Sequence, residues 1–322
     1  MPKLKKRPSF EVTTFHGIAT ASKNMLDFFH LMEKAARSEA NILIRGESGT
    51  GKELVARAIH HLSPRAKGSF HALNCASLTS ELMQSELFGH VKGSFTGAIS
   101  DRKGLFEAAH NGSLFLDEIA ELPADIQPRL LRVLQDRQFS PVGSFKQIKA
   151  NIRLISATHR SLRNMVERGD FRADLMYRVR VVPLFIPRLA ERPKDIELLM
   201  WLFIDEFNKH RLRIVKAIEQ DAMDAMLNYQ WPGNIRELRN NIEYAFVSGD
   251  GETIKLNDLT PELQGIPTPH ETGLAPESFV HNEIESIRLA LRDSKNRKGV
   301  AAEKLGMSRA TLWRKIREFG IS

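Results

Sequence analysis

The chain has 322 residues, of which 42% are hydrophobic, and this is enough apolar material for two or three folded domains. Its single cysteine, Cys75, excludes an internal disulfide framework, is typical of a reducing compartment, and is expected to be buried and unreactive. No apolar run approaches the ~18 residues that span a bilayer, and the basic start of the chain lacks the apolar core of a signal peptide. We therefore expect a cytoplasmic protein with no membrane partner.

The net charge of +8 is concentrated at the two ends of the chain. Residues 1–10 hold four basic and no acidic side chains, and residues 281–322 hold ten basic and five acidic ones. The long segment between them is close to neutral. This distribution predicts a near-neutral body with a basic module attached. We interpret residues 1–15 as a basic tail rather than a binding arm.

The strongest pattern lies at residues 41–60, where an apolar run leads through a glycine-dense turn into a helix. Apolar residues at helical spacing predict another helix before it, over 16–40. The turn matches G-x-x-x-x-G-K, in which backbone N–H groups surround a phosphate and the lysine reaches its outer oxygens. The predicted NTP phosphate loop comprises Gly46, Glu47, Ser48, Gly49, Thr50, Gly51, Lys52 and Glu53. Glu53 replaces the usual Ser or Thr, and a glycine-rich turn capping an ordinary helix is the alternative.

Polar residues follow three further predicted strands. The strand within 112–118 ends in Asp117, which could hold Mg²⁺, and Glu118, which could act as the general base. On their own, two acids after a strand are as typical of a solvated turn as of a catalytic site. The phosphate loop in the same chain favours the catalytic interpretation. The strand 69–75 carries Asn74, and the strand 151–157 ends in Thr158 and His159. In a doubly wound sheet these strand ends face the ligand crevice, although His159 could also be an ordinary loop histidine.

The chain becomes helical after residue 187. Before that point, Arg172 and Arg178 are either solvated surface residues or charges supplied to a phosphate, including that of a neighbouring subunit. A helix beginning at Pro193, a second over 217–229, and a third capped by Asn234 then form a small subdomain, with Arg236 on the polar side of the third helix. Residues 264–280 are rich in Pro, Gly, Thr and Ser, and this composition predicts a linker.

Residues 281–322 show three helical segments, with Leu291, Ala301 and Leu312 among the positions predicted to face inward. Their spacing predicts a helix-turn-helix whose third helix enters the DNA major groove. The outer face of that helix offers side chains suited to phosphates and guanine edges: Arg309, Thr311, Arg314, Lys315 and Arg317. A three-helix protein-binding module is the alternative.

From about residue 16 to 322 the sequence resembles the bacterial enhancer-binding proteins, the AAA+ activators of sigma-54 RNA polymerase. The most specific sign is Gly93-Ser94-Phe95-Thr96-Gly97-Ala98, similar to the family's G-A-F-T-G-A loop that contacts sigma-54, with Ser94 in place of alanine. The segments GESGTGKE, LNCASL, SELFGH, SLFLDE, FRADLMYR and WPGNIREL occur in the family's order, and Glu53 is usual there.

The resemblance implies an α/β AAA+ P-loop domain over 16–188, in which a parallel sheet belongs to a three-layer architecture. It implies a helical lid subdomain over 189–263 and, after the linker, an all-α, Fis-like helix-turn-helix DNA-binding domain over 281–322. The implied cofactors are ATP and Mg²⁺. The resemblance also implies that Asn74 restrains Glu118. Thr158, His159 and Arg236 would sense the nucleotide. Arg172 and Arg178 would insert into the next subunit.

The implied partners are sigma-54 RNA polymerase holoenzyme, enhancer DNA, and further copies of the chain, from a dimer to a hexameric ring. The AAA+ pattern begins without the N-terminal sensory domain of most members, so control by a separate regulatory protein in trans competes with control by expression. One alternative function is an AAA+ DNA-binding regulator that senses nucleotide or ligand without remodelling sigma-54. Another is a different AAA+ machine, such as a helicase or an unfoldase.

Overall fold

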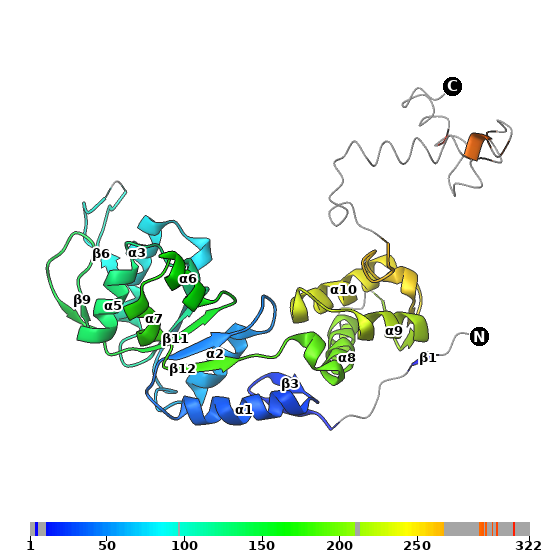
Figure 1. Cartoon of the computed structure of the whole chain (residues 1–322), viewed down its shortest axis with the longest axis horizontal. Helices are drawn as coiled ribbons and strands as arrows, with labels where there is room; N and C mark the ends of the chain where they lie inside the picture. Colours follow the sequence, from blue (N-terminus) through cyan, green and yellow to red (C-terminus); the bar gives the residue numbers. More distant parts are fainter. Residues whose placement is uncertain are drawn as a thin grey trace. The chain divides into compact units, whose positions relative to one another are not determined.

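The structure is a computed structural model that describes residues 4–5, 11–95, 97–209, 213–266, 290–292, 294, 298, 301 and 312. The chain separates into two compact units, Met1–Thr260 and Pro261–Ser322. All helices and strands named below belong to the first unit (Figure 1). In the described part of the chain, no helix combines the length and hydrophobicity that a membrane span requires.

A five-stranded parallel sheet forms the centre of the first unit. Its order is β12 (Val182–Phe185), β4 (Ile42–Arg45), β11 (Arg153–Thr158), β8 (Ser113–Asp117) and β5 (Phe70–Asn74). All neighbouring pairs are parallel, so the carboxyl ends of the strands meet at one edge of the sheet. All six residues of β11 are buried, as expected for a parallel strand covered on both faces.

Helices cover both faces of this sheet and complete the three layers that the sequence predicts (Figure 1). Helices α1 (Lys23–Ala36) and α2 (Lys52–His61) pack on one face, around Ile42 and Ile44. Helices α3 (Ser80–Phe88), α5 (Gln127–Asp136), α6 (Leu162–Arg168) and α7 (Ala173–Val179) pack on the other face with Leu43. Successive strand residues point to opposite faces, so three adjacent residues of β4 serve two separate cores.

Short elements connect these layers: α4 (Leu105–Ala108), β6 (Gly89–His90), β7 (Arg102–Lys103), β9 (Gln138–Phe139), β10 (Ile148–Lys149) and the 3-10 helices η1 (Cys75–Ser77) and η2 (Ile119–Glu121). In η1, Cys75 is buried, and burial raises the pKa of its thiol to about 12. This confirms the prediction that Cys75 is buried, and the raised pKa disfavours the thiolate, which is the reactive form.

The segment before the sheet differs from the prediction. Helix α1 begins at Lys23 rather than near residue 16, and β2 (Thr13–Phe15) and β3 (Ile18–Thr20) form a hairpin in front of it. The turn residues His16 and Gly17 have φ values of 46° and 83°. Positive φ at both positions is the geometry that two-residue hairpin turns favour. The apolar spacing of this stretch also fits a helix, so periodicity alone extended the predicted helix too far.

A helical subdomain follows the sheet. It contains α8 (Pro193–Lys209), α9 (Gln220–Asn228), α10 (Asn234–Ser248), the 3-10 helices η3 (Leu189–Glu191) and η4 (Leu256–Asp258), and the strands β1 (Leu4–Lys5), β13 (Ala217–Glu219) and β14 (Thr253–Ile254). The helix predicted to begin at Pro193 is confirmed. The second helix begins at Gln220 rather than at 217, because residues 217–219 form β13 and pair with β1 and β14.

Asn234 is not the N-cap that the sequence predicts for α10. Gly233 occupies the N-cap position, and the carboxylate of Glu237 accepts a hydrogen bond from the Gly233 N–H at 2.7 Å. Asn234 is the first residue of the helix, has φ of 51°, and is fully buried. Its side chain points away from its own helix, to partners described below. The prediction was wrong because a buried long-range contact competes with the local cap.

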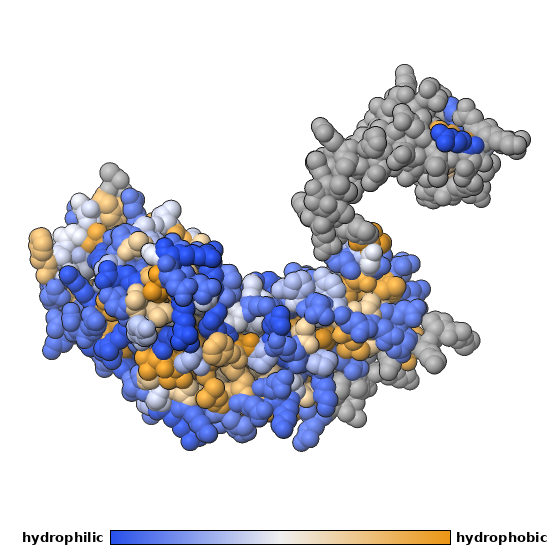
Figure 2. All heavy atoms as spheres, viewed as in Figure 1, coloured by the Kyte–Doolittle hydropathy of each residue, from blue (hydrophilic) through white to orange (hydrophobic). Residues whose placement is uncertain are grey.

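Hydrophilic side chains cover most of the visible face of the first unit, and apolar ones gather over the region of α1 and β12 (Figure 2). On these elements, Leu31 of α1 and Phe185 of β12 are exposed. β12 lies at the edge of the sheet, so its outer side has no strand partner in that sheet.

Candidate active site

Residues 46–53 connect the carboxyl end of β4 to the first turn of α2. Gly49 and Gly51 have φ values of 77° and 93°, and these left-handed turns let successive N–H groups face an anion. The hydroxyl of Thr50 donates to the carbonyl of Glu47 at 2.8 Å and tightens the turn. The amino end of α2 adds a dipole that favours negative charge. The segment therefore has the form of a phosphate-binding loop.

Lys52 folds back over this loop. It is only 7% exposed, and its Nζ donates to the carbonyl oxygens of Gly46 and Glu47 at 3.2 and 3.3 Å. The same Nζ lies 3.1 Å from Oε1 of Glu118. The lysine thus joins the loop after β4 to the acid that follows β8.

Glu118 is held from two sides. Lys52 pairs with its Oε1, and Nδ1 of His159 donates to its Oε2 at 2.8 Å. Glu118 has φ of 50°, a conformation that is uncommon outside glycine. Its backbone N–H donates to Oδ1 of Asp117 at 3.1 Å. The structure therefore brings together four residues that the sequence predicts for one site, from β8, β11 and the start of α2.

The two adjacent carboxyl groups have pKa values shifted in opposite directions. Burial and the charge of Glu118 raise the pKa of Asp117, and Lys52 opposes part of this effect. Burial also raises the pKa of Glu118, but hydrogen bonds from His159 and Lys52 outweigh it and hold that pKa below its ordinary value. The two adjacent acids therefore stand in different electrostatic environments.

Asn74 and Thr158 lie at the carboxyl ends of β5 and β11. Asn74 stands opposite Asp117 in the sheet register, and its Oδ1 accepts a hydrogen bond from the Ala76 N–H at 2.8 Å. Thr158 is fully buried, and its carbonyl accepts from the Gly46 N–H at 3.4 Å. Within the described residues, the hydrogen bonds to the carboxylate of Glu118 come from Lys52 and His159. Restraint of Glu118 by Asn74 stays a prediction.

The helical subdomain contacts the phosphate loop through the first turn of α10. Nη1 of Arg236 donates to Oγ of Ser48 at 3.0 Å, and the N–H of Ile235 donates to the carbonyl of Gly49 at 3.1 Å. A Cβ atom on Gly49 would overlap the carbonyl of Gly233. Gly49 is therefore required by the approach of α10 as well as by the turn of its own loop.

Asn234 belongs to this site, which the sequence did not reveal. Its Nδ2 donates to the carbonyl of Ser48 and to Oε2 of Glu47, both at 3.1 Å. Its Oδ1 accepts from the N–H of Leu189 at 2.9 Å. One buried amide thus connects the phosphate loop, η3 and α10. No local pattern signals such a role.

An apolar cavity of about 220 Å³ adjoins the phosphate loop at Thr50 and Gly51. Its walls come from the β2–β3 hairpin, α2, α8 and α10, and include Ile18, Leu54, Arg192, Leu199, Phe203 and Ile235. Small-molecule sites are typically apolar with a few placed polar groups. The sequence did not predict this cavity, because its walls are far apart along the chain and its hairpin was assigned to a helix.

Arg172 directly precedes α7 and Arg178 lies in its last turn, and both contact residues close to them. Nε and Nη2 of Arg172 donate to the carboxylate of Asp174 at 3.1 and 2.8 Å. Nη2 of Arg178 donates to the carbonyl of Leu134 in α5 at 3.2 Å. Among the described hydrogen bonds, neither arginine joins the phosphate loop of its own chain.

The segment between α3 and α4 is a hairpin that projects from the sheet domain. β6 and β7 pair in antiparallel fashion at its base, where a Cβ on Gly104 would overlap the Gly89 N–H. At its tip, the N–H of Gly93 donates to the carbonyl of Ala98 at 2.9 Å. The ring of Phe95 packs edge-on against His90 yet remains 39% exposed. Thr96 lies outside the described residues.

A second hairpin, β9–β10, supports the first. The N–H of Val142 donates to the carbonyl of Gly89 at 2.9 Å, and the Val91 N–H donates to the carbonyl of Val142 at 3.1 Å. Phe145, in the turn of this second hairpin, is completely exposed. Both hairpins therefore present an exposed aromatic residue.

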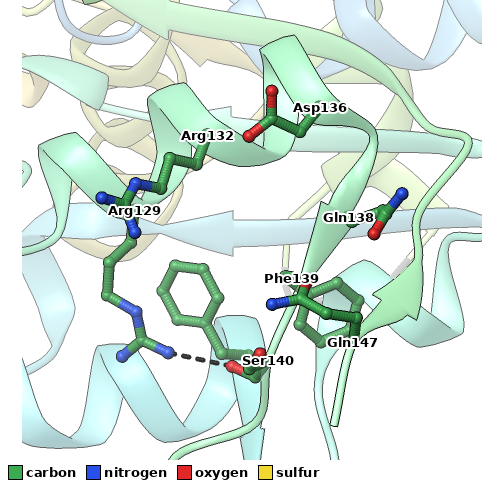
Figure 3. Close-up of a pocket in the computed structure, with 8 residues that line it drawn as sticks. Arg129, Arg132, Asp136, Gln138, Phe139, Ser140 and Gln147 are labelled. Atoms are coloured by element: carbon green, nitrogen blue, oxygen red, sulfur yellow. Dashed lines mark hydrogen bonds between the residues drawn. The ribbon is translucent and has the colours of Figure 1, made fainter. Parts of the chain in front are cut away.

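A polar cavity of about 510 Å³ lies at the base of these hairpins (Figure 3). Arg129 of α5 stacks on the ring of Phe88, with its Cζ 3.8 Å from the ring centroid. Its guanidinium donates to Oε1 of Gln84 at 2.9 Å and to the carbonyl of Ser140 at 3.1 Å. Arg129 thus ties α3, α5 and the segment after β9 to one another.

The five predicted DNA contacts, Arg309, Thr311, Arg314, Lys315 and Arg317, lie outside the described residues. Leu291, Ala301 and Leu312 are described, and all three are buried as predicted.

The parallel sheet, the phosphate loop, and the helical subdomain that contacts it define an AAA+ P-loop protein. Residues 18–185 match the family model of the sigma-54 interaction domain, residues 190–275 that of the AAA+ ATPase lid domain, and residues 283–319 that of the bacterial regulatory protein, Fis family. The chain belongs to the family of sigma-54-dependent transcriptional activators. This confirms the family and the fold class that the sequence predicts.

Named relatives agree with this assignment. The nitrogen fixation protein AnfA of Azotobacter vinelandii is 44% identical over 306 residues, which are 94% of this chain and 57% of that protein. The regulatory protein AtoC of Escherichia coli K12 is 45% identical over 312 residues, 94% of this chain and 68% of that protein. The chain therefore spans roughly 57–68% of the length of these two relatives.

Among solved structures, NtrX from Brucella abortus matches with a TM-score of 0.73 at 37% identity, covering 94% of this chain and 69% of that one. NtrX in complex with ATP matches with a TM-score of 0.72 at 35% identity and the same coverage.

Proposed function

We propose that this protein binds and hydrolyses ATP at the phosphate loop. The observation that carries the proposal is the convergence of Lys52, Asp117, Glu118 and His159 beside the loop. The phosphates of ATP would compete with Glu118 for Lys52, since both are anions within its reach. Oε1 of Glu118 would then be free to accept a proton from the attacking water. The ATP complex of the related NtrX supports the choice of nucleotide.

The residues present also fit Mg²⁺. In the described part of the chain, no cluster of three or more His, Cys, Asp or Glu side chains could hold a metal by itself. Mg²⁺ typically takes one or two carboxylates together with water and substrate phosphates, and Asp117 offers one carboxylate beside the loop. When bound there, the ion would neutralise charge that develops on the phosphates.

We propose that hydrolysis drives remodelling of sigma-54 RNA polymerase from the closed to the open promoter complex. Residues 93–98 would contact sigma-54, and the C-terminal domain would bind enhancer DNA. The match to the sigma-54 interaction domain and the exposed ring of Phe95 support this proposal. Trapping by ADP and aluminium fluoride, a mimic of phosphoryl transfer, tests it. We expect a complex with sigma-54 only when the mimic is present.

The alternative regulator, which does not remodel sigma-54, makes the opposite prediction. It would hydrolyse ATP without trapping sigma-54, and neither the natural protein nor Thr96→Ala would melt the promoter. A helicase or unfoldase would act on a bare duplex or a folded protein in an ATP-dependent manner. If Thr96→Ala abolishes promoter melting while ATPase activity persists, the activator is supported and both alternatives fail.

We propose a ring, up to a hexamer, in which Arg172 and Arg178 act on the nucleotide of the next subunit. Their contacts with Asp174 and Leu134, rather than with their own phosphate loop, support action in trans. Mixing two inactive variants, Glu118→Gln and Arg178→Ala, tests this. Mixed rings contain some interfaces with an intact site and an intact arginine, so we expect partial recovery of ATPase activity. Absence of recovery in mixed rings would contradict action in trans.

Control of this activity by a separate protein that binds the ring in trans is a further proposal. Pull-down of a cell extract on the purified ring, compared between inducing and non-inducing growth, tests it. An anti-activator should bind reversibly and lower the ATPase rate, whereas a co-activator should raise it. If protein purified from cells grown under each condition instead shows the same ATPase rate, and only its cellular amount changes, control lies in expression.

A further inference from the structure

Arg192 occupies an unusual position at the start of α8. It is 1% exposed, and it forms part of the wall of the apolar cavity beside Thr50 and Gly51. The remaining walls bring apolar side chains such as Ile18, Phe203 and Ile235. A guanidinium in such surroundings is costly unless its donors find acceptors.

The described part of the chain does not satisfy this guanidinium. Nε and Nη2 of Arg192 are buried without a hydrogen-bond partner, and Nη1 lies 3.6 Å from Oδ2 of Asp195. That carboxylate is already engaged, because it accepts from the hydroxyl of Thr20 and from the Ala21 N–H. Burial lowers the pKa of Arg192, and the charge of Asp195 opposes the shift. Arg192 is thus a buried charged group beside the cavity, and its Nε and Nη2 donors lack acceptors within the described residues.

The cavity begins where the phosphate loop ends. A nucleotide whose phosphates lie on residues 46–53 would direct its base past Thr50 and Gly51, into the space between the β2–β3 hairpin and the helical subdomain. Adenine has two apolar faces, which suit the walls, and its ring nitrogens N1, N3 and N7 only accept hydrogen bonds. Arginine only donates.

We propose that Arg192 donates a hydrogen bond to a ring nitrogen of the purine base and so contributes to the choice of nucleotide. This inference rests on the proposed ATP site and adds a base-reading residue to it. Because an unpaired buried donor is costly, a base that lacks the acceptor leaves the guanidinium unsatisfied and binds more weakly.

Calorimetric titration of the full chain with ATP and with its 1-deaza, 3-deaza and 7-deaza analogues tests the proposal. Each analogue replaces one ring nitrogen by C–H. For the natural sequence we expect one analogue to bind about 10- to 100-fold more weakly than ATP, the size of a hydrogen bond to a charged group. Arg192→Met should weaken ATP binding by a similar factor and should bind that analogue and ATP equally.

Lys194→Met is the matched control, because it removes one positive charge from an exposed residue in the first turn of α8, two positions after Arg192. It should leave the pattern of the analogues unchanged. Arg192→Lys keeps the charge and serves in place of Arg192→Met if the latter does not fold. Inorganic tripolyphosphate, which has no base, should bind the natural protein and Arg192→Met equally.

Three results would overturn the inference. If all three analogues bind the natural protein as ATP does, the spare donors serve a buried water instead. If Arg192→Met weakens tripolyphosphate as much as ATP, the arginine only supports the fold. If ATP itself does not bind the natural protein, the proposed function fails and this inference falls with it.

Discussion

The phosphate site and the hairpin between α3 and α4 are built in contrasting ways. In the phosphate site, Lys52, Glu118 and Asn234 each contact at least two partners from separate parts of the chain. In the hairpin, the described backbone hydrogen bonds of the tip join residues within five positions of one another, and Ile99 is 83% exposed. The molecule thus holds the side chains of the phosphate site from several directions and fixes the proposed contact loop mainly at its base.

This difference suits the two tasks proposed for these regions. Catalytic groups need fixed positions, because small misplacements cost rate. A loop that must contact a partner in one nucleotide state and leave it in another needs few competing contacts at its tip. Changes in the phosphate site should therefore alter ATP hydrolysis. Changes at the tip of the hairpin should alter only the proposed action on sigma-54.

The largest effect is expected from Glu118→Gln. The substitution keeps the shape of the side chain but removes the general base, so kcat for ATP hydrolysis should fall about 10²- to 10⁴-fold. ATP affinity should be kept or rise, since the phosphate loop stays intact and the anion that competes for Lys52 is neutralised. Phosphate release and calorimetric titration measure the two quantities. Glu167→Gln, an exposed change in α6, is the control. Unchanged hydrolysis in Glu118→Gln would exclude Glu118 as the base.

Asn234→Ala should be the next most damaging change. It removes the only described link between Leu189 and the carbonyl of Ser48 and leaves buried polar groups unpaired. The free energy of unfolding should therefore fall by about 1–3 kcal/mol. Because the amide also positions the phosphate loop, nucleotide affinity should fall as well. Denaturant unfolding and calorimetric titration measure both effects.

Asn208→Ala provides a matched comparison for this prediction. The Asn208 amide makes two hydrogen bonds, with the carbonyl and the N–H of Val215, and both lie within the helical subdomain. It should lower the unfolding free energy and leave nucleotide affinity unchanged. Equal losses of affinity in both variants would mean that Asn234 acts through general stability.

Phe95→Ser tests the other side of the comparison. The exposed ring contributes little to the fold, so ATPase activity and stability should stay near those of the natural protein. Trapping of sigma-54 with ADP and aluminium fluoride should be lost. Phe145→Ser, in the second hairpin, separates the two tips: if it alone also abolishes trapping, both hairpins contact the partner. A fall in ATPase activity in Phe95→Ser would contradict the separation of the two regions.

The smallest expected effect concerns pH. The pKa of Glu118 lies below its ordinary value because His159 and Lys52 donate to it. A base with a lowered pKa stays ionised, and active, until the pH falls through that lowered value. His159→Ala removes one donor, so the acid limb of kcat/KM should move to higher pH. His30→Ala, an exposed change in α1, should not move it. An unmoved acid limb in His159→Ala would show that His159 does not influence the base.

The sequence predicts those parts of this molecule that depend on residues close together in the chain. The phosphate loop and the pair Asp117-Glu118 are short motifs, and parallel strands bring them together without further information. Asn234 and Arg192 were beyond reach, because their roles depend on residues more than a hundred positions away. The β2–β3 hairpin was missed because its apolar spacing also suits a helix.

The base of the α3–α4 hairpin has a consequence for how such proteins diversify. Gly89 and Gly104 approach so closely that side chains would collide, and the rings of Phe88 and Phe106 pack together beneath them at 5.2 Å. The chain thus leaves and re-enters the core at one point, whatever lies between. We expect that a segment of another length or sequence can be grafted in place of residues 90–103 without changing the distance that the core must span. The proposed contact with sigma-54 would then change independently of the proposed ATPase site.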